Sequence, residues 1–263
     1  MATEPLAGKS VLVTGGARRI GRAIALTLAH AGADVAVSYR ASQPEADETA
    51  AEIVALGRRA LAIPCDVRSE PSVRAAVAQA VATFGHLDLL VNNAAVFASA
   101  ALESLSLDQW DAVFETNARG PFLVAREALP HLRAVHGRIV NIGSLGATRA
   151  WAGHAHYCAS KAALHMLTQA MAKAFAPEVS VNCVAPGWIE FPTSPEFPQS
   201  PAAQSVASAR PAAAREAARF AARTPMGRNG AASDVAQAVL FFASGPHFIT
   251  GQILAVDGGL GLS

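Results

Sequence analysis

The sequence predicts a single α/β domain in which a parallel sheet of seven strands carries helices on both faces. Short apolar runs alternate with longer segments whose apolar residues recur at helical spacing. A strand at 10–14 leads through a glycine-rich turn into a helix and then into a strand at 35–39, which completes one βαβ unit. Strands alternating with helices favour a parallel sheet wrapped on both faces. At 263 residues the chain suits one such domain, over 1–263.

Five further strands are expected, at 60–65, 87–91, 138–142, 179–184 and 250–259. One long helix is predicted over 107–135, with a kink at 118–121 and Asn117 just before it. Another helix is expected to start near His156, and Ser233 to Ala236 are expected to cap a last one. Proline-rich and then alanine-rich sequence predicts a substrate lid at about 190–223.

Composition indicates a cytoplasmic protein that acts on a small molecule. The 21 Lys and Arg residues nearly balance the 20 Asp and Glu residues, without a basic stripe or an acidic block. This balance argues against nucleic acid as a partner and against an electrostatic membrane anchor. The three cysteines form no C-x-x-C pair, as is typical of a reducing compartment, and no metal site is expected. The sequence also lacks a signal peptide pattern and any apolar run long enough to span a bilayer.

The turn from Thr14 to Gly21 is the first candidate for a binding site. It follows a strand and opens a helix, so its free backbone N–H groups and the helix dipole favour an anion such as pyrophosphate. A glycine-rich turn can also be only a tight connection. After the second strand, Arg40 stands where an NAD site would place Asp or Glu, and its guanidinium suits a ribose 2′-phosphate. NADP(H) is therefore favoured, with Ser42, Arg18 or Arg19 adding contacts, although an arginine after a strand is often merely solvated.

Two further strand ends carry polar residues at the same predicted edge. Asp66 ends the third strand and is placed to contact adenine, since ligands of open parallel sheets gather at that edge. Alternatively, Asp66 or Ser69 caps the helix that follows. Asn92-Asn93-Ala94-Ala95 after the fourth strand forms a turn of small and polar residues that can approach a cofactor closely, and we expect both asparagines to brace the strand ends.

Tyr157 and Lys161 are the candidates for proton transfer. At i and i+4 they share one face of a helix, so the ammonium can lie near the phenol and favour its ionised form. Such a tyrosine can act as an acid or base near neutral pH. Ser144 follows the fifth strand and reaches the same edge of the sheet. Taken alone, these residues could also be an ordinary helix-face pair and a turn serine.

With these motifs in this order, the chain resembles the short-chain dehydrogenase/reductase family over nearly its full length. The resemblance implies a Rossmann-type fold, with Tyr157 as the acid or base and Ser144 positioning the substrate oxygen. It also implies that Lys161 binds the nicotinamide ribose and that Asn117 holds a water in a proton relay. A homotetramer or homodimer built on the helices at about 107–135 and 156–175 is implied as well. The expected cofactor-binding residues are Gly15, Arg18, Arg19, Ile20, Gly21, Tyr39, Arg40, Asp66, Val67, Asn93, Ala94, Ala95, Tyr157, Lys161, Pro186, Gly187 and Ile189.

Arg19 departs from the family's usual turn, which has a glycine at this position. The form with arginine resembles the turn of pteridine reductases, and Phe97 falls where those enzymes stack a pterin ring. Ser144, however, stands where that subgroup typically has an aspartate. The chain thus combines a pteridine-reductase-like turn with the ordinary serine triad of the family.

The expected reaction is hydride transfer from NADPH to a ketone-type carbonyl, of the 3-oxoacyl kind or a small or aromatic ketone, with Tyr157 as proton donor. The alternatives are a pteridine reductase, which reduces a pterin C=N bond, and a non-catalytic NADP(H)-binding protein. Trp151 and Phe191 would join an apolar, aromatic pocket in which His154 offers a hydrogen bond, unless that histidine is structural. The expected substrate-binding residues are Phe97, Ser144, Leu145, His154 and Trp188.

Overall fold

A seven-stranded parallel sheet forms the centre of the structure, a computed structural model that describes residues 4–191 and 210–262. The strand order is β3-β2-β1-β4-β5-β6-β9, and every neighbouring pair runs parallel. Strand order reverses between β1 and β4, and open α/β sheets bind ligands at such a point, outside the carboxyl ends of the strands. The predicted Rossmann-type fold is confirmed.

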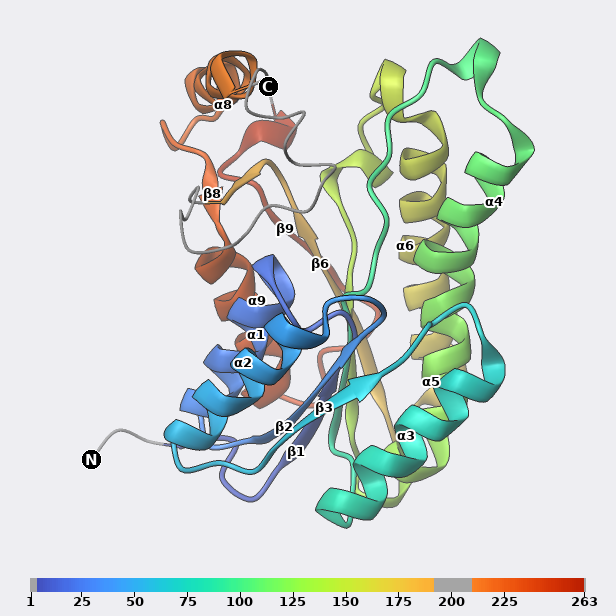
Figure 1. Cartoon of the computed structure of the whole chain (residues 1–263), viewed down its shortest axis with the longest axis vertical. Helices are drawn as coiled ribbons and strands as arrows, with labels where there is room; N and C mark the ends of the chain where they lie inside the picture. The colour runs from blue at the N-terminus through green and yellow to red at the C-terminus, as the bar shows by residue number, and fades with distance from the viewer. Residues whose placement is uncertain (1–3, 192–209, 263) are drawn as a thin grey trace.

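The strands of the sheet are β1 (Ser10–Val13), β2 (Asp34–Tyr39), β3 (Ala60–Pro64), β4 (Leu89–Asn92), β5 (Arg138–Ile142), β6 (Ser180–Pro186) and β9 (Ile253–Val256). The helices are α1 (Arg19–His30), α2 (Gln43–Ala55), α3 (Glu70–Phe84), α4 (Leu107–Phe114), α5 (Gly120–Ala134), α6 (Ala155–Phe175), α8 (Arg210–Arg223) and α9 (Ala232–Ser244). Figure 1 shows the helices on either side of the sheet.

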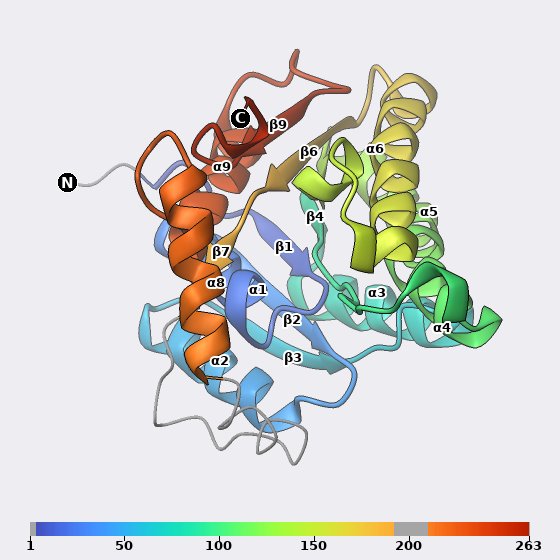
Figure 2. The same ribbon diagram turned by 90° about the horizontal axis from the view of Figure 1, so that it is seen from above.

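Side chains alternate between two hydrophobic cores along the central strands, because successive residues of a strand point to opposite faces. Val11 and Val13 of β1 pack with residues of α1, α2 and α9, whereas Leu12 packs with residues of α3, α5 and α6. Figure 2 shows these two helical layers from above, with the sheet between them. Both faces of the strands are therefore dry, as expected for a parallel sheet.

The helix predicted over 107–135 is divided by a π-helical turn, Glu115–Arg119, which lies between α4 and α5. Pro121 is the second residue of α5, where its missing N–H is tolerated in the first turn of a helix. The helix is interrupted close to the kink predicted at 118–121, because the π-helical turn begins three residues earlier, and Asn117 lies inside this turn.

Helix caps differ from the prediction at one of two sites. Ser69 caps α3, since its side chain accepts a hydrogen bond from the Ser72 N–H. The expected cap from Ser233 onward is wrong by two residues: α9 is preceded by Ala231, whose N–H donates to the Asp234 carboxylate at 2.7 Å. Alanine has no capping side chain, so the sequence pattern pointed to the nearby serine instead.

Only part of the predicted lid can be compared with the structure. Residues 192–209 of the expected lid at about 190–223 lie outside the described residues. The alanine-rich part forms α8, as expected. Two short strands, β7 (Ile189–Glu190) and β8 (Gly230–Ala231), pair in parallel beside the main sheet and were not predicted, because two residues give no periodicity.

Among the helices described, none combines the length and the apolar composition needed to cross a membrane.

Candidate active site

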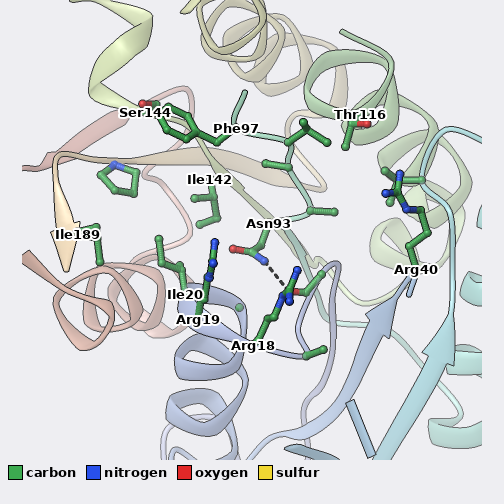
Figure 3. A pocket seen from close by; sticks show the side chains of 18 of the residues that line it. Arg18, Arg19, Ile20, Arg40, Asn93, Phe97, Thr116, Ile142, Ser144 and Ile189 are labelled. Atoms are coloured by element: carbon green, nitrogen blue, oxygen red, sulfur yellow. Dashed lines mark hydrogen bonds between the residues drawn. The ribbon is translucent and has the colours of Figure 1, made fainter. Parts of the chain in front are cut away.

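A pocket of about 600 Å³ follows the carboxyl ends of the strands. All residues of the predicted cofactor-binding set line it, as do Ser144, Phe97 and Trp188. Figure 3 shows Ser144 and Arg40 on opposite sides of this pocket. Its volume is in the range of small-molecule sites. The topology thus brings most of the sequence-predicted site residues together.

The glycine-rich turn leaves its backbone open toward the pocket because Asn93 holds it from behind. The Asn93 amide donates to the carbonyl oxygens of Thr14 (3.0 Å) and Gly15 (2.9 Å). A side chain at Gly21 would collide with the Gly15 carbonyl oxygen and with this amide, so the close approach requires glycine. Asn92 donates to Asn141 at 2.9 Å. Both asparagines brace strand ends, as the sequence predicted.

Three arginines present positive charge to the pocket: Arg18, Arg19 and Arg40. In the described part of the chain, no carboxylate forms an ion pair with any of them. Burial, and then the charge of Arg18, lower the pKa of Arg19. Arg19 also has a φ of 53°, a left-handed conformation that is unusual for a residue other than glycine. These unpaired cations favour an anionic ligand.

Asp66 lines the pocket, and Ser69 rather than Asp66 caps α3, while the contact of Asp66 with adenine remains a prediction. Arg68 forms an ion pair with it, with 2.6 Å between Nη2 and Oδ2. The hydrogen bond from the Arg68 side chain lowers the pKa of Asp66 to about 2. The carboxylate is therefore ionised at neutral pH and can act only as a hydrogen-bond acceptor.

Ser144, Tyr157 and Lys161 meet at the end of β5. Ser144 is buried, and its Oγ accepts a hydrogen bond from the Gly146 N–H at 3.0 Å. Lys161, 2% exposed, donates from Nζ to the Ile142 carbonyl oxygen at 2.7 Å. The same Nζ lies 5.9 Å from the centre of the Tyr157 ring. The helical spacing thus places the ammonium beside the tyrosine, as predicted.

Burial dominates the titration of this cluster. It raises the pKa of Tyr157, against a smaller lowering by a hydrogen bond with the Ser144 side chain. It also lowers the pKa of Lys161 to about 8. Desolvation of the phenolate is the largest cause of the raised pKa of Tyr157, and the effect of the Lys161 ammonium on this tyrosine remains a prediction. The tyrosine is held as a neutral acid.

Asn117 is fixed by its own side chain. Its amide donates to the Val96 carbonyl oxygen (2.9 Å) and to Ser160 Oγ (3.1 Å), and its Oδ1 accepts from the Val96 N–H (2.8 Å). The residue is fully buried and does not line the pocket. These bonds join the π-helical turn to the segment after β4 and to α6. A water held at Asn117 remains a prediction.

Aromatic rings cover Tyr157. The Phe97 ring meets the Tyr157 ring edge-on at 4.8 Å and stacks on His154 at 4.4 Å, while Trp151 lies parallel to Tyr157 at 6.2 Å. His154 Nδ1 is 2.9 Å from the Ala98 carbonyl oxygen. Neither His154 nor Leu145 lines the pocket, so the structure does not bring these two predicted substrate residues to it. His154 instead packs its ring against the ring of Phe97.

Seven lining residues were missed by the sequence reasoning. Most of them are close in sequence to a strand end or turn that was recognised, so including the neighbours of each motif would have found them. Thr116 gave no such signal, because only the π-helical turn brings it to the pocket. The missed residues are Ala17, Ala41, Cys65, Val96, Thr116, Ile142 and Gly143.

Gly143 lies against two buried side chains behind Ser144. A Cβ at this position would collide with His165 Nε2 and would lie 2.7 Å from Cys183 Sγ. Burial, and then the charge of Lys161, lower the pKa of His165 to about 4. Burial raises the pKa of Cys183 to about 12. Both groups are therefore neutral at pH 7, which leaves Lys161 as the charge in this cluster.

The lowered pKa of His165 predicts that the folded protein loses stability in acid. Its folded pKa of about 4 is below the ordinary 6.5, so protons bind the unfolded chain better and stability falls as pH drops from 6.5 to 4. His165→Leu should therefore reduce the acid-induced loss in the free energy of unfolding by on the order of 2 kcal/mol. Denaturant unfolding at pH 7 and pH 4.5 measures it, with exposed His30→Leu as control. Equal acid sensitivity in wild type and His165→Leu would contradict the expectation.

Comparison with known proteins assigns the family. A family model described as enoyl-(acyl carrier protein) reductase matches residues 15–261. The chain is 36% identical over 255 residues to the 3-oxoacyl-(acyl-carrier-protein) reductase FabG of Staphylococcus aureus (strain Mu50 / ATCC 700699), covering 96% of this chain and 98% of the relative. This chain belongs to the short-chain dehydrogenase/reductase family. It is therefore similar to oxidoreductases that act on a carbonyl.

Solved structures of this family superimpose on nearly the whole chain. A short-chain dehydrogenase/reductase from Serratia marcescens BCRC 10948 is 37% identical with a TM-score of 0.86, and the match covers 98% of this chain and 99% of that one. A short chain dehydrogenase from Burkholderia cenocepacia J2315, in complex with NADP, is 41% identical with a TM-score of 0.83, covering 97% and 99%.

Proposed function

We propose that this short-chain dehydrogenase/reductase is an NADPH-dependent reductase of ketone-type carbonyls, with Tyr157 as the proton donor. The observation that carries the proposal is the convergence of Ser144, Tyr157 and Lys161 at one end of the pocket, across from Arg40. An acid, an oxygen-positioning hydroxyl and a buried cation are the groups that a carbonyl reduction needs.

The residues along the pocket fit a dinucleotide that carries a 2′-phosphate. The turn before α1 offers backbone N–H groups at a helix N-terminus, where a pyrophosphate is stabilised. Arg40 follows β2, where a carboxylate would repel a 2′-phosphate, and Arg18 adds a second cation. The relative from Burkholderia cenocepacia in complex with NADP supports this choice of cofactor.

The chain's own groups handle the proton and the oxygen, and NADPH, when bound, supplies the hydride. Ser144 donates a hydrogen bond to the carbonyl oxygen, and the Tyr157 hydroxyl transfers its proton to that oxygen. The raised pKa of Tyr157 keeps the phenol protonated until the oxygen becomes basic. Lys161 then stabilises the phenolate that is left, and we assign it the nicotinamide ribose as a further contact. The aromatic rings around Tyr157 limit water at the reacting carbon.

The substrate end of the pocket suits a neutral carbonyl compound. Phe97, Trp151, Trp188 and Phe191 line it, and none of these side chains is charged. A pteridine reductase is the second candidate, favoured by Arg19 and by the 58% exposed ring of Phe97, which could stack on a pterin. Ser144 in place of an aspartate favours the carbonyl reductase.

Oxidation of NADPH with a panel of substrates tests these alternatives. The panel contains a 3-oxoacyl thioester, an aryl ketone and dihydrobiopterin. We expect turnover of at least one ketone and little with the pterin. Turnover of dihydrobiopterin alone would favour the second candidate, and a silent panel with tight NADPH binding would leave a non-catalytic binding protein.

Arg40→Asp is expected to change the cofactor preference. Loss of the guanidinium and repulsion by the new carboxylate should weaken NADPH binding about 10- to 100-fold, while a hydroxyl-bearing ribose gains an acceptor. Dissociation constants for NADPH and NADH, from fluorescence titration, measure the change. Exposed Arg133→Asp on α5 is the control with the same charge change. An unchanged NADPH/NADH ratio would refute the role of Arg40.

We also propose a homotetramer or homodimer in the cytoplasm, built on the α4–α5 region and α6, with residues 190–223 as the substrate lid of a single domain. Helix α8 supports the lid assignment, since Phe220 stacks on the pocket residue Trp188 at 4.1 Å. Light scattering coupled to gel filtration tests the assembly, and a monomeric mass would exclude it.

A further inference from the structure

Asp257 follows β9 at the edge of the sheet and folds the residues after it into a turn. Its Oδ1 accepts the Gly259 N–H at 2.9 Å and its Oδ2 accepts the Gly261 N–H at 2.8 Å. Gly258 and Gly259 both have left-handed φ angles, of 60° and 85°, which other residues rarely adopt. In the described part of the chain, the Asp257 carboxylate forms no ion pair. Both carboxylate oxygens of Asp257 therefore bind backbone N–H groups of the turn that follows.

The turn that Asp257 closes, Leu260–Leu262, lies against the catalytic serine loop. A Cβ at Gly261 would lie 3.1 Å from Leu145 Cδ1, and Leu145 directly follows Ser144. The Arg149 guanidinium, at the end of the same loop, donates to the Gly261 carbonyl oxygen. Arg149 is tied back to that loop through its N–H, which donates to the Leu145 carbonyl oxygen at 3.0 Å. The turn therefore contacts the serine loop by packing and by a charged hydrogen bond.

Asp257 also contacts the Pro186–Gly187 loop, which lines another part of the pocket. A Cβ at Gly187 would lie 2.7 Å from Asp257 Cβ, so the two backbones touch without room for a side chain. Gly187 donates its N–H to the Val256 carbonyl oxygen at 3.0 Å, and both Pro186 and Gly187 line the pocket. One residue thus joins the loop after β6 to the loop after β5.

We propose that Asp257 is a positioning residue for the reaction: through the turn 258–262 and through Gly187, it fixes the distance between Ser144 and the Pro186–Gly187 loop. This inference rests on the proposed function, in which Ser144 contacts the substrate oxygen and the Pro186–Gly187 loop contacts the cofactor. Catalysis is sensitive to displacements of about 1 Å between such groups. Asp257 touches neither substrate nor cofactor and acts through the backbone alone.

Asp257→Asn tests the proposal with nearly unchanged shape. One carboxylate oxygen becomes an amide that cannot accept a backbone N–H, so one of the two bonds is lost. We expect kcat to fall about 10- to 100-fold, with KM for the ketone changing less than about threefold. Asp88→Asn is the matched control, since Asp88 also accepts a backbone N–H, from Ser10 at 2.9 Å, at the opposite edge of the sheet. The control should lose stability and keep kcat.

Two further measurements keep the result independent of folding and of activity. Hydrogen exchange of the cofactor-free protein should be faster over residues 144–149 in Asp257→Asn than in Asp88→Asn. Arg149→Met removes the other tie to the turn, so the double variant should lose less than the product of the two single losses in kcat. Unchanged exchange at 144–149, or multiplicative losses, would overturn the proposal. If the wild type were inactive on every ketone, the proposed function would be wrong. The hydrogen-exchange result would still test the positioning role of Asp257.

Discussion

Tyr157→Phe is expected to lower kcat for ketone reduction by roughly 10²- to 10⁴-fold, the usual contribution of a positioned general acid. Only the hydroxyl is removed, and the ring keeps its contacts with Phe97 and Trp151. NADPH affinity should therefore stay within about threefold of wild type. Stopped-flow turnover and fluorescence titration with NADPH measure the two quantities separately. A variant that keeps wild-type kcat would require another proton donor.

The pH profile of the wild type gives an independent check on the same residue. Burial raises the pKa of Tyr157, so this acid stays protonated well into the alkaline range. Burial also lowers the pKa of Lys161 to about 8, so the supporting charge is lost as pH rises through that value. Reduction should be flat below pH 7 and fall above pH 8. The residual activity of Tyr157→Phe should lack this fall, because no phenolate needs stabilising.

Lys161→Met is expected to abolish turnover and yet stabilise the apoprotein at pH 7. The pKa of Lys161 falls from 10.5 to about 8 on folding, so burying the ammonium is unfavourable below pH 8. By this shift, removing the charge should raise the free energy of unfolding by roughly 3 kcal/mol. The Ile142 carbonyl oxygen, left without a donor, should lower it again by about 1–2 kcal/mol. A net gain of about 1–2 kcal/mol should remain.

The pH dependence of that gain identifies its source. Between pH 8 and 10.5 the unfolded lysine is still charged while the folded one is neutral, so the wild type regains stability as pH rises. The advantage of Lys161→Met should shrink over this range, vanish between about pH 9 and 10, and reverse near pH 10.5, where only the lost hydrogen bond to Ile142 remains. Urea unfolding at pH 7 and pH 9.5 measures it. Lys173→Met, at an exposed position of the same helix, is the control, and a destabilised Lys161→Met at pH 7 would contradict the expectation.

The sequence predicted the location of the site better than its electrostatics. Residues such as Arg40, Asp66 and Ser144 each follow a strand, and a parallel sheet brings all strand ends to one edge, so local patterns were sufficient. The pKa of Tyr157 depends on how deeply the folded chain buries it, which no local pattern reports. The short strands β7 and β8 were missed for a similar reason, since only their mutual pairing defines them.

Side-chain direction was the other quantity that the sequence could not supply. His154 was a candidate for contact with substrate, but the Ala98 carbonyl oxygen, 56 residues earlier, holds its ring behind Phe97. The side-chain hydrogen bonds of Asn117 to Val96 and Ser160 were likewise not predictable from the sequence. In both cases the decisive partner comes from a distant segment.

The left-handed backbone at Arg19 means that stability and cofactor affinity select for different residues at this position. Glycine would adopt the same φ without the penalty of about 1 kcal/mol that a Cβ incurs there. It would also remove one of the three guanidinium groups beside the pocket. A thermostability screen without cofactor should therefore enrich Arg19→Gly, and a screen at limiting NADPH should reject it.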